Sequence, residues 1–257
     1  MRATAPDGLS IVYDDRGTGT PLLLVHGWCS NRRDWDDSAE ILARSRRVLS
    51  IDRRGHGESD VPDGHSTHTD HAADMLAVLD AASVDRCVVV AHAGGGPGAM
   101  EFARAHPDRT AALVLVDTML RDGPLETPDG QPSPLESLVA LLESEGGDET
   151  FAQMYRGFFA RPDAPAAVRA VSDAGTIPHH VRCGELLGIG IDTIAICSEI
   201  DAPVLWLHVA ELDERVETTF ADVEIRALAD VGHFAQVDDR ALVASTIDDF
   251  VTRRVEA

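Results

Sequence analysis

The 257-residue sequence predicts an α/β fold in which a mainly parallel sheet carries helices on both faces. Three observations indicate this fold class. Short, continuously apolar segments, typical of strands covered on both faces, alternate along the chain with segments of helical periodicity. Glycine-containing turns follow several of the apolar segments. The length suits one such domain with a modest insertion.

The first part of the chain supplies strands and helices in alternation. Four consecutive apolar residues, Leu22 to Val25, predict a strand buried on both faces, and Trp35, Ala39 and Leu42 share one helical face. In chain order, the expected elements are strands at 10–14 and 21–26, a helix that includes 35–42, a strand at 47–51 and a helix at 67–82.

The second part of the chain contains a long interruption. A strand from residue 87, a tight turn at 91–96, a helix at 97–105 and a strand at 112–116 are followed by mixed Gly, Pro, acidic and helical stretches. Strands at 204–209 and 223–228 and a terminal helix complete the pattern. We therefore expect a core domain at 1–118 and 201–257 with an inserted helical cap at 119–200.

Composition narrows the class of function. The net charge is −22 and every basic residue is Arg, so the chain is expected to repel nucleic acid and anionic membranes. We interpret the acidity as a solvated surface and not as steering of a cationic substrate. The four cysteines lie far apart, which indicates neither a disulfide framework nor a zinc site. No membrane-spanning run or signal-peptide core is found, and a cytoplasmic protein is expected.

Four motifs occur in a fixed order within this framework. His26-Gly27-Trp28 follows one strand, residues 52–59 form a Gly-rich loop after the next, a small-residue turn occupies 91–95, and Gly232-His233-Phe234 lies near the end. In this order the motifs resemble the α/β-hydrolase family, and the resemblance covers the chain outside the cap. It implies a mainly parallel eight-stranded sheet with helices on both faces.

The turn at 91–95 departs from the family at one position. In the family this turn reads Gly-X-Ser-X-Gly, and the serine sits on a strained strand-to-helix elbow. Here the central residue is Ala93, although its small neighbours Ala91, Gly94 and Gly95 are kept. A methyl group cannot attack a carbonyl, so no acyl-enzyme is expected to form at Ala93.

The resemblance also implies an acid–base pair. His233 takes the place of the family's general base, and the acid is expected after the seventh strand, where Asp213 lies in the turn 210–213. Asp117, at the end of the sixth strand, is the competing candidate, because some members place the acid there. We favour Asp213 over Asp117.

The remaining site residues are backbone donors. The N–H groups of Trp28 and Gly94 are expected to form the oxyanion hole, the second of them at the positive end of the helix after the elbow. His65, His68 and His71 cluster before a helix, but no carboxylate or cysteine supports them at a metal-ligand spacing. We therefore expect no metal and no cofactor.

Three explanations of Ala93 remain open. The preferred one is a carboxylic-ester or lactone hydrolase with a Ser-His-Asp triad, here in a form inactivated by a Ser-to-Ala change. The second is a natural nucleophile-free enzyme (a lyase, cyclase or cofactorless dioxygenase) that uses a His–Asp dyad. The third is a non-catalytic binder of small molecules.

The apolar residues of the expected cap indicate the class of substrate only broadly. Apolar cap residues suggest a small-molecule ester or lactone of moderate size, although they suit the cap's own core equally well. The haloperoxidase-like members share the loop at 52–57, whereas a haloalkane dehalogenase needs an aspartate nucleophile. The apolar cap residues are Phe151, Met154, Tyr155, Phe158, Phe159, Leu186 and Leu187.

Overall fold

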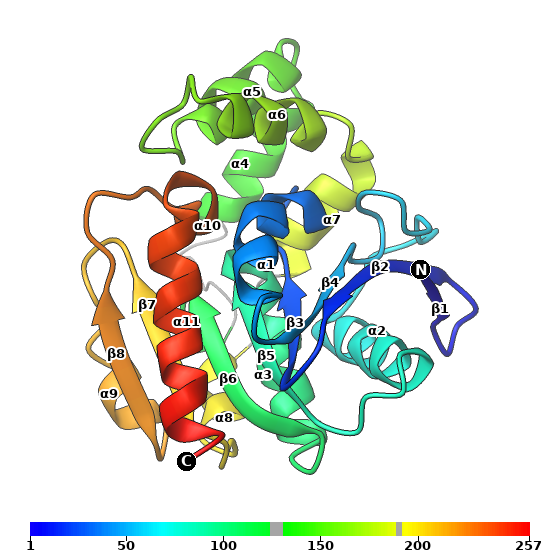
Figure 1. Cartoon of the computed structure of the whole chain (residues 1–257). Helices are drawn as coiled ribbons and strands as arrows, with labels where there is room; N and C mark the ends of the chain where they lie inside the picture. Colours follow the sequence, from blue (N-terminus) through cyan, green and yellow to red (C-terminus); the bar gives the residue numbers. More distant parts are fainter. Residues whose placement is uncertain (124–130, 189–191) are drawn as a thin grey trace.

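The computed structural model, which describes residues 1–123, 131–188 and 192–257, contains an eight-stranded sheet (Figure 1). The strand order is β1-β2-β4-β3-β5-β6-β7-β8; β2 runs antiparallel to both of its neighbours, and all other pairs are parallel. The predicted mainly parallel sheet is therefore confirmed. The strands are β1 (Arg2–Thr4), β2 (Ser10–Gly17), β3 (Pro21–Val25), β4 (Arg47–Ile51), β5 (Cys87–His92), β6 (Thr110–Val116), β7 (Val204–His208) and β8 (Val223–Ala227).

Helices cover both faces of the sheet, which explains the continuously apolar strands. Side chains alternate along β3, so Leu23 and Val25 pack in one apolar cluster and Leu22 and Leu24 in another. The first cluster lies against α2 (His68–Ala81) and α3 (Gly96–Ala105), and the second lies against α1 (Asp36–Leu42) and α11 (Arg240–Arg254).

The segment between β6 and β7, which we call the insertion, contributes helices beyond the carboxyl ends of the parallel strands (top of Figure 1). Its helices α4 to α7 form a third apolar cluster together with Cys29 and Phe234 of the core. The helix α8 instead packs on α3. Its residue Cys197 lies in a core cluster, although the cap is expected to extend to residue 200. The insertion helices are α4 (Pro134–Glu143), α5 (Gly147–Arg156), α6 (Pro165–Ala174), α7 (His179–Gly188) and α8 (Thr193–Cys197).

Polar contacts join the insertion to the loops that follow β3 and β4. Arg53, which is 4% exposed, forms an ion pair of 2.8 Å with Glu185 of α7. The Trp28 indole donates a hydrogen bond of 2.9 Å to the Arg182 carbonyl, and the Tyr155 hydroxyl donates one of 3.0 Å to the Cys29 carbonyl. The insertion is thus held directly over the turn that follows β3.

Three further helices are short. A 3₁₀ turn, η1 (Arg32–Trp35), precedes α1, and α9 (Val216–Thr219) and α10 (Ala235–Asp238) flank β8. None of the helices in the described residues is long and apolar enough to cross a membrane.

Candidate active site

The elbow expected at residues 91–95 is present between β5 and α3. Ala93 has φ +45°, a left-handed conformation that a non-glycine residue adopts only when its surroundings impose it. A Cβ atom on Gly95 would lie 2.5 Å from the His26 carbonyl oxygen, so only glycine allows this close approach of backbones. The strained turn that presents a nucleophile is therefore kept, although it presents a methyl group.

The two backbone nitrogens expected to form an oxyanion hole lie together. A Cβ atom on Gly94 would be 3.0 Å from the Trp28 nitrogen, which places these two residues in direct contact. Gly94 lies in the 3₁₀ turn η2 (Ala93–Gly95), which leads into α3, and the first N–H groups of a helix have no intrahelical acceptor. The Trp28 N–H donates to no acceptor in the part of the chain that the structure describes.

His233 lies between β8 and α10, and its ring is paired with a carboxylate. Its Nδ1 atom donates a hydrogen bond of 2.6 Å to the Asp117 Oδ2 atom. Asp117, the residue directly after β6, has φ +46°, and its Oδ1 atom accepts a hydrogen bond of 3.2 Å from the Val209 N–H. Burial raises the pKa of Asp117, but the hydrogen bond from His233 and the electrostatic interaction with that ring outweigh this and hold the pKa of Asp117 below its usual value. Asp117 is therefore ionised and fixes the orientation of the ring.

The prediction that Asp213 occupies this place is corrected by the structure. The Asp213 carboxylate is engaged by Arg215, whose guanidinium donates to Asp213 at 2.6 Å and 2.9 Å. This hydrogen bonding lowers the pKa of Asp213. Both carboxylates line one cavity, but Arg215 holds Asp213 while the left-handed backbone at Asp117 turns that side chain to His233.

The sequence alone indicates no role for His92, the residue before Ala93. Its Nε2 atom lies 2.8 Å from the His233 carbonyl oxygen, which can only accept, so the proton of His92 is on Nε2. Burial lowers the pKa of His92 to about 3 and keeps the ring neutral. The two rings lie 4.7 Å apart between centroids. His92 thus ties the loop of His233 to the elbow.

A cavity of about 590 Å³ opens over these residues. Ala93, Gly94, His233 and Asp117 line it together with apolar side chains of the insertion. Of the apolar residues expected to line a pocket, Met154, Tyr155, Phe158 and Leu186 do so, whereas Phe151 and Phe159 pack in the insertion's own cluster. The side chain of Leu187 lies outside those described. A polar part of the wall consists of Arg121, Thr193, His208, Glu211, Asp213 and Arg215.

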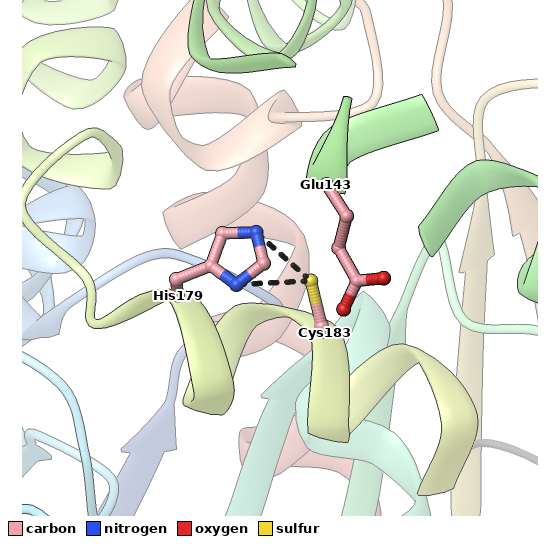
Figure 2. A group of neighbouring side chains, drawn as sticks. All are labelled: Glu143, His179 and Cys183. Atoms are coloured by element: carbon pink, nitrogen blue, oxygen red, sulfur yellow. Dashed lines mark hydrogen bonds between the residues drawn. The ribbon is translucent and has the colours of Figure 1, made fainter. Parts of the chain in front are cut away.

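Among the described residues, one group of side chains lies close enough together to be considered as a metal site (Figure 2). Glu143, His179 and Cys183 bring their ligand atoms within 4.8 Å of one another, in the insertion and outside the cavity wall. The Cys183 sulfur is 3.6 Å from Nε2 and 3.8 Å from Nδ1 of His179. Because the sulfur is nearly as close to one ring nitrogen as to the other, it lies in front of neither nitrogen's lone pair, and neither lone pair points toward it. We assign no metal to it.

Comparisons with known proteins agree with this architecture. A family model described as alpha/beta hydrolase fold matches residues 20–164. A non-heme chloroperoxidase of Streptomyces lividans is 41% identical over 121 residues, which are 45% of this chain and 44% of that protein. A non-heme chloroperoxidase of Kitasatospora aureofaciens is 30% identical over 222 residues, 80% of this chain and 78% of that protein.

A solved structure described as an N-acyl homoserine lactone degrading enzyme superposes with a TM-score of 0.81 at 25% identity, covering 98% of this chain and 100% of that one. The matched region thus spans less than half the length of the Streptomyces relative but most of the other two proteins. Since the family model covers more than half of the sequence and the Kitasatospora relative aligns over most of it, the chain belongs to the α/β-hydrolase fold family.

Proposed function

We propose that this chain binds a carboxylic ester or a lactone in the cavity over Ala93, at a site organised for acyl transfer that lacks only the nucleophile's hydroxyl. The observation that carries the proposal is the pairing of His233 with Asp117 in the same cavity as a left-handed elbow residue. In this proposal residues 119–200 act as a cap over the bound molecule.

Each part of the site has a role in that chemistry. With serine at position 93, its Oγ would attack the carbonyl carbon while Nε2 of His233 takes the hydroxyl proton, and Asp117 would stabilise the imidazolium. The N–H groups of Trp28 and Gly94 would bind the oxygen that becomes negative. The proton then passes to the departing alcohol, and water releases the acid by the same route. With Ala93 the substrate binds, but no acyl-enzyme forms.

The relatives support this substrate class without fixing it. The N-acyl homoserine lactone degrading enzyme acts on a lactone, and its fold covers 98% of this chain. The cavity wall, largely apolar with a few convergent polar groups, suits a molecule with an apolar body and one reactive carbonyl.

A second candidate function is proton abstraction by the dyad alone. The observation that favours it is the short His233–Asp117 hydrogen bond of 2.6 Å, which persists although Ala93 offers nothing for a base to activate. A neutral imidazole held in one tautomer beside a carboxylate can remove a proton from an acidic substrate without a covalent intermediate. The reaction would then be proton exchange, elimination or rearrangement of the substrate and not hydrolysis.

The Ala93→Ser variant separates the two candidates. We expect it to hydrolyse 4-nitrophenyl esters or simple lactones at least ~10³-fold faster than the original chain, because loss of a triad nucleophile costs about 10⁶ in kcat. The Ala93→Ser/His233→Ala double variant is the matched control and should lose this gain. If the serine variant binds these compounds but does not hydrolyse them, the acyl-transfer proposal fails and the dyad proposal gains support.

A further inference from the structure

Arg121 lies four residues beyond Asp117, where the chain leaves β6. Its backbone is fixed by the start of α8, because its N–H donates to Thr193 Oγ1 at 2.7 Å and its carbonyl accepts the Ile194 N–H at 3.1 Å. Arg121 lines the cavity that also contains Ala93 and His233. A backbone fixed by hydrogen bonds therefore places Arg121 at the proposed substrate site.

This guanidinium has no protein partner in the described part of the chain. Its Nε atom is buried without a hydrogen bond, and Arg121 takes part in none of the ion pairs. The other arginine of the cavity wall, Arg215, is neutralised by Asp213 at 2.6 Å. Burial lowers the pKa of Arg121, and no neighbouring carboxylate offsets this cost.

A partly buried arginine without an ion pair is unusual in the described part of this protein, because the other arginines that lack one are exposed. The sequence has 44 acidic residues for 22 basic ones, so a carboxylate partner is abundant wherever the fold needs one. Leaving a buried donor unsatisfied destabilises the folded state, because the group has lost water and gained nothing in exchange. A ligand that carries an anionic oxygen would remove this cost on binding, through the paired donors of the guanidinium fork.

We infer that Arg121 binds a carboxylate of the substrate that is separate from the reacting carbonyl group. The substrate class would then be an ester or lactone with a free carboxylate, and this inference rests on the proposed function. A singly charged carboxylate fits better than a doubly charged phosphate, since Glu211 belongs to the same wall. Its negative charge would repel a dianion more strongly.

A pair of esters that differ in one charge tests the inference. The unaltered chain is titrated by calorimetry with 4-nitrophenyl hydrogen adipate, which is anionic, and with 4-nitrophenyl methyl adipate, which is neutral. We expect the anionic ester to bind about tenfold more tightly, the size of one charge-assisted hydrogen-bonded pair that is partly exposed to solvent. Arg121→Met should abolish this preference without weakening the neutral ester, and Arg121→Lys should restore part of it.

Two controls keep the outcome specific. Arg44→Met removes the same charge from an exposed residue outside the cavity wall, and the preference should survive it. In the Ala93→Ser background, Arg121→Met should raise KM for the anionic ester about tenfold and leave kcat unchanged, the pattern expected for a residue that binds without taking part in the reaction.

The results distinguish the inference from the proposed function. Equal binding of both esters, unaffected by Arg121→Met, would overturn the carboxylate assignment and leave the ester proposal standing. Failure of both esters to bind would contradict the ester proposal. The affinity for hexanoate, a simple carboxylate, then tests whether Arg121 binds an anion. Unchanged hexanoate affinity in Arg121→Met would overturn the assignment, whereas a loss of about tenfold would support an anion site independent of ester chemistry.

Discussion

His233 is held at two atoms by residues that lie at the ends of two neighbouring strands. Asp117, which directly follows β6, accepts a hydrogen bond from its Nδ1 atom, and His92, the last residue of β5, donates one to its carbonyl oxygen. The first contact fixes the ring and the second fixes the loop that carries it. His233 and Ala93 line the same cavity, and in the proposed function the Nε2 atom of His233 is the base.

The identity of the acid gives a direct prediction. In the Ala93→Ser background, Asp117→Asn should lower kcat by about 10⁴, since an amide cannot hold the required tautomer or stabilise an imidazolium. Asp213→Asn is the matched control and should change kcat less than tenfold, because that carboxylate is paired with Arg215. Steady-state hydrolysis of one 4-nitrophenyl ester measures both variants. A larger loss in Asp213→Asn would contradict the assignment.

The sequence limits the proposed acid to two candidates, Asp117 and Asp213, but does not choose between them. Both carboxylates follow the ends of adjacent parallel strands, β6 and β7, so motif order alone leaves the choice open. The decision depends on the left-handed backbone of Asp117 and on Arg215 beside Asp213, which are features of the folded chain. Arg215, two residues after Asp213, was the one signal in the sequence that could have indicated a local pair.

Other parts of the site were hidden from sequence for a related reason. In the sequence, His92 occupies the variable position of the elbow, and Arg121 is one of many arginines and lies in a polar stretch, so neither residue is singled out. What distinguishes them is a contact with His233 in one case and the absence of a partner in the other. Neither property is local in the chain, so neither could be predicted from spacing.

At the scale of elements, the insertion is joined to the core through buried polar groups as well as apolar packing. Asp34, in η1, is a second example beside the Arg53–Glu185 pair: it accepts a hydrogen bond of 2.6 Å from Ser30 and lies 3.7 Å from Arg169 of α6. Burial raises the pKa of Asp34 to about 6, above the value of 3.8 for a free carboxyl. The junction between η1 and α6 therefore depends on pH.

The sign of this dependence can be tested. A folded-state pKa above the unfolded one means that the folded chain binds the Asp34 proton more tightly, so stability is lost as pH rises from about 4 to about 6. Relative to the unaltered chain, Asp34→Asn should gain roughly 2–3 kcal/mol of unfolding free energy between pH 4 and pH 7. Urea unfolding at both pH values measures this. Exposed Asp63→Asn should show no such change, and an equal change in both variants would contradict the prediction.

Elements with strong patterns were predicted well, and the weakly patterned ones were not. Strands buried on both faces can be predicted from continuous apolar runs such as Leu22 to Val25. The edge strand β1 was not located from its residues, because three residues with one buried side chain carry no periodic signal. The sequence pattern does not separate α8 from the other helices of the expected cap, whereas in the structure α8 packs against α3.

At the scale of the whole molecule, the charge of −22 sets a repulsive background for the fold. Many arginines are paired with carboxylates at the surface, but half of the acidic charge has no basic counterpart in the sequence. Self-repulsion of this kind destabilises the compact state and is screened by salt. The fold therefore tolerates its acidity best at high ionic strength.

Salt should accordingly stabilise the protein. Raising NaCl from about 10 mM to about 1 M shortens the screening length from ~30 Å to ~3 Å, so the thermal midpoint should rise over this range. Circular dichroism melting at pH 7 measures the shift, and a neutral osmolyte at matched osmolality should not reproduce its steep onset below 0.2 M. A midpoint that falls with salt would show that attractive ion pairs outweigh the net repulsion.

In the proposed function, Ala93, His233 and the two backbone donors form an acyl-transfer site that is complete except for the nucleophile's hydroxyl. The most direct measurement is labelling of Ala93→Ser with an alkyl fluorophosphonate, in which the serine oxygen bonds to phosphorus, fluoride leaves and His233 takes the proton. Mass spectrometry should find one adduct, at position 93, and none in the original chain or in Ala93→Ser/His233→Ala. A folded Ala93→Ser protein that stays unlabelled, or labelling that does not need His233, would contradict the proposed acyl-transfer site.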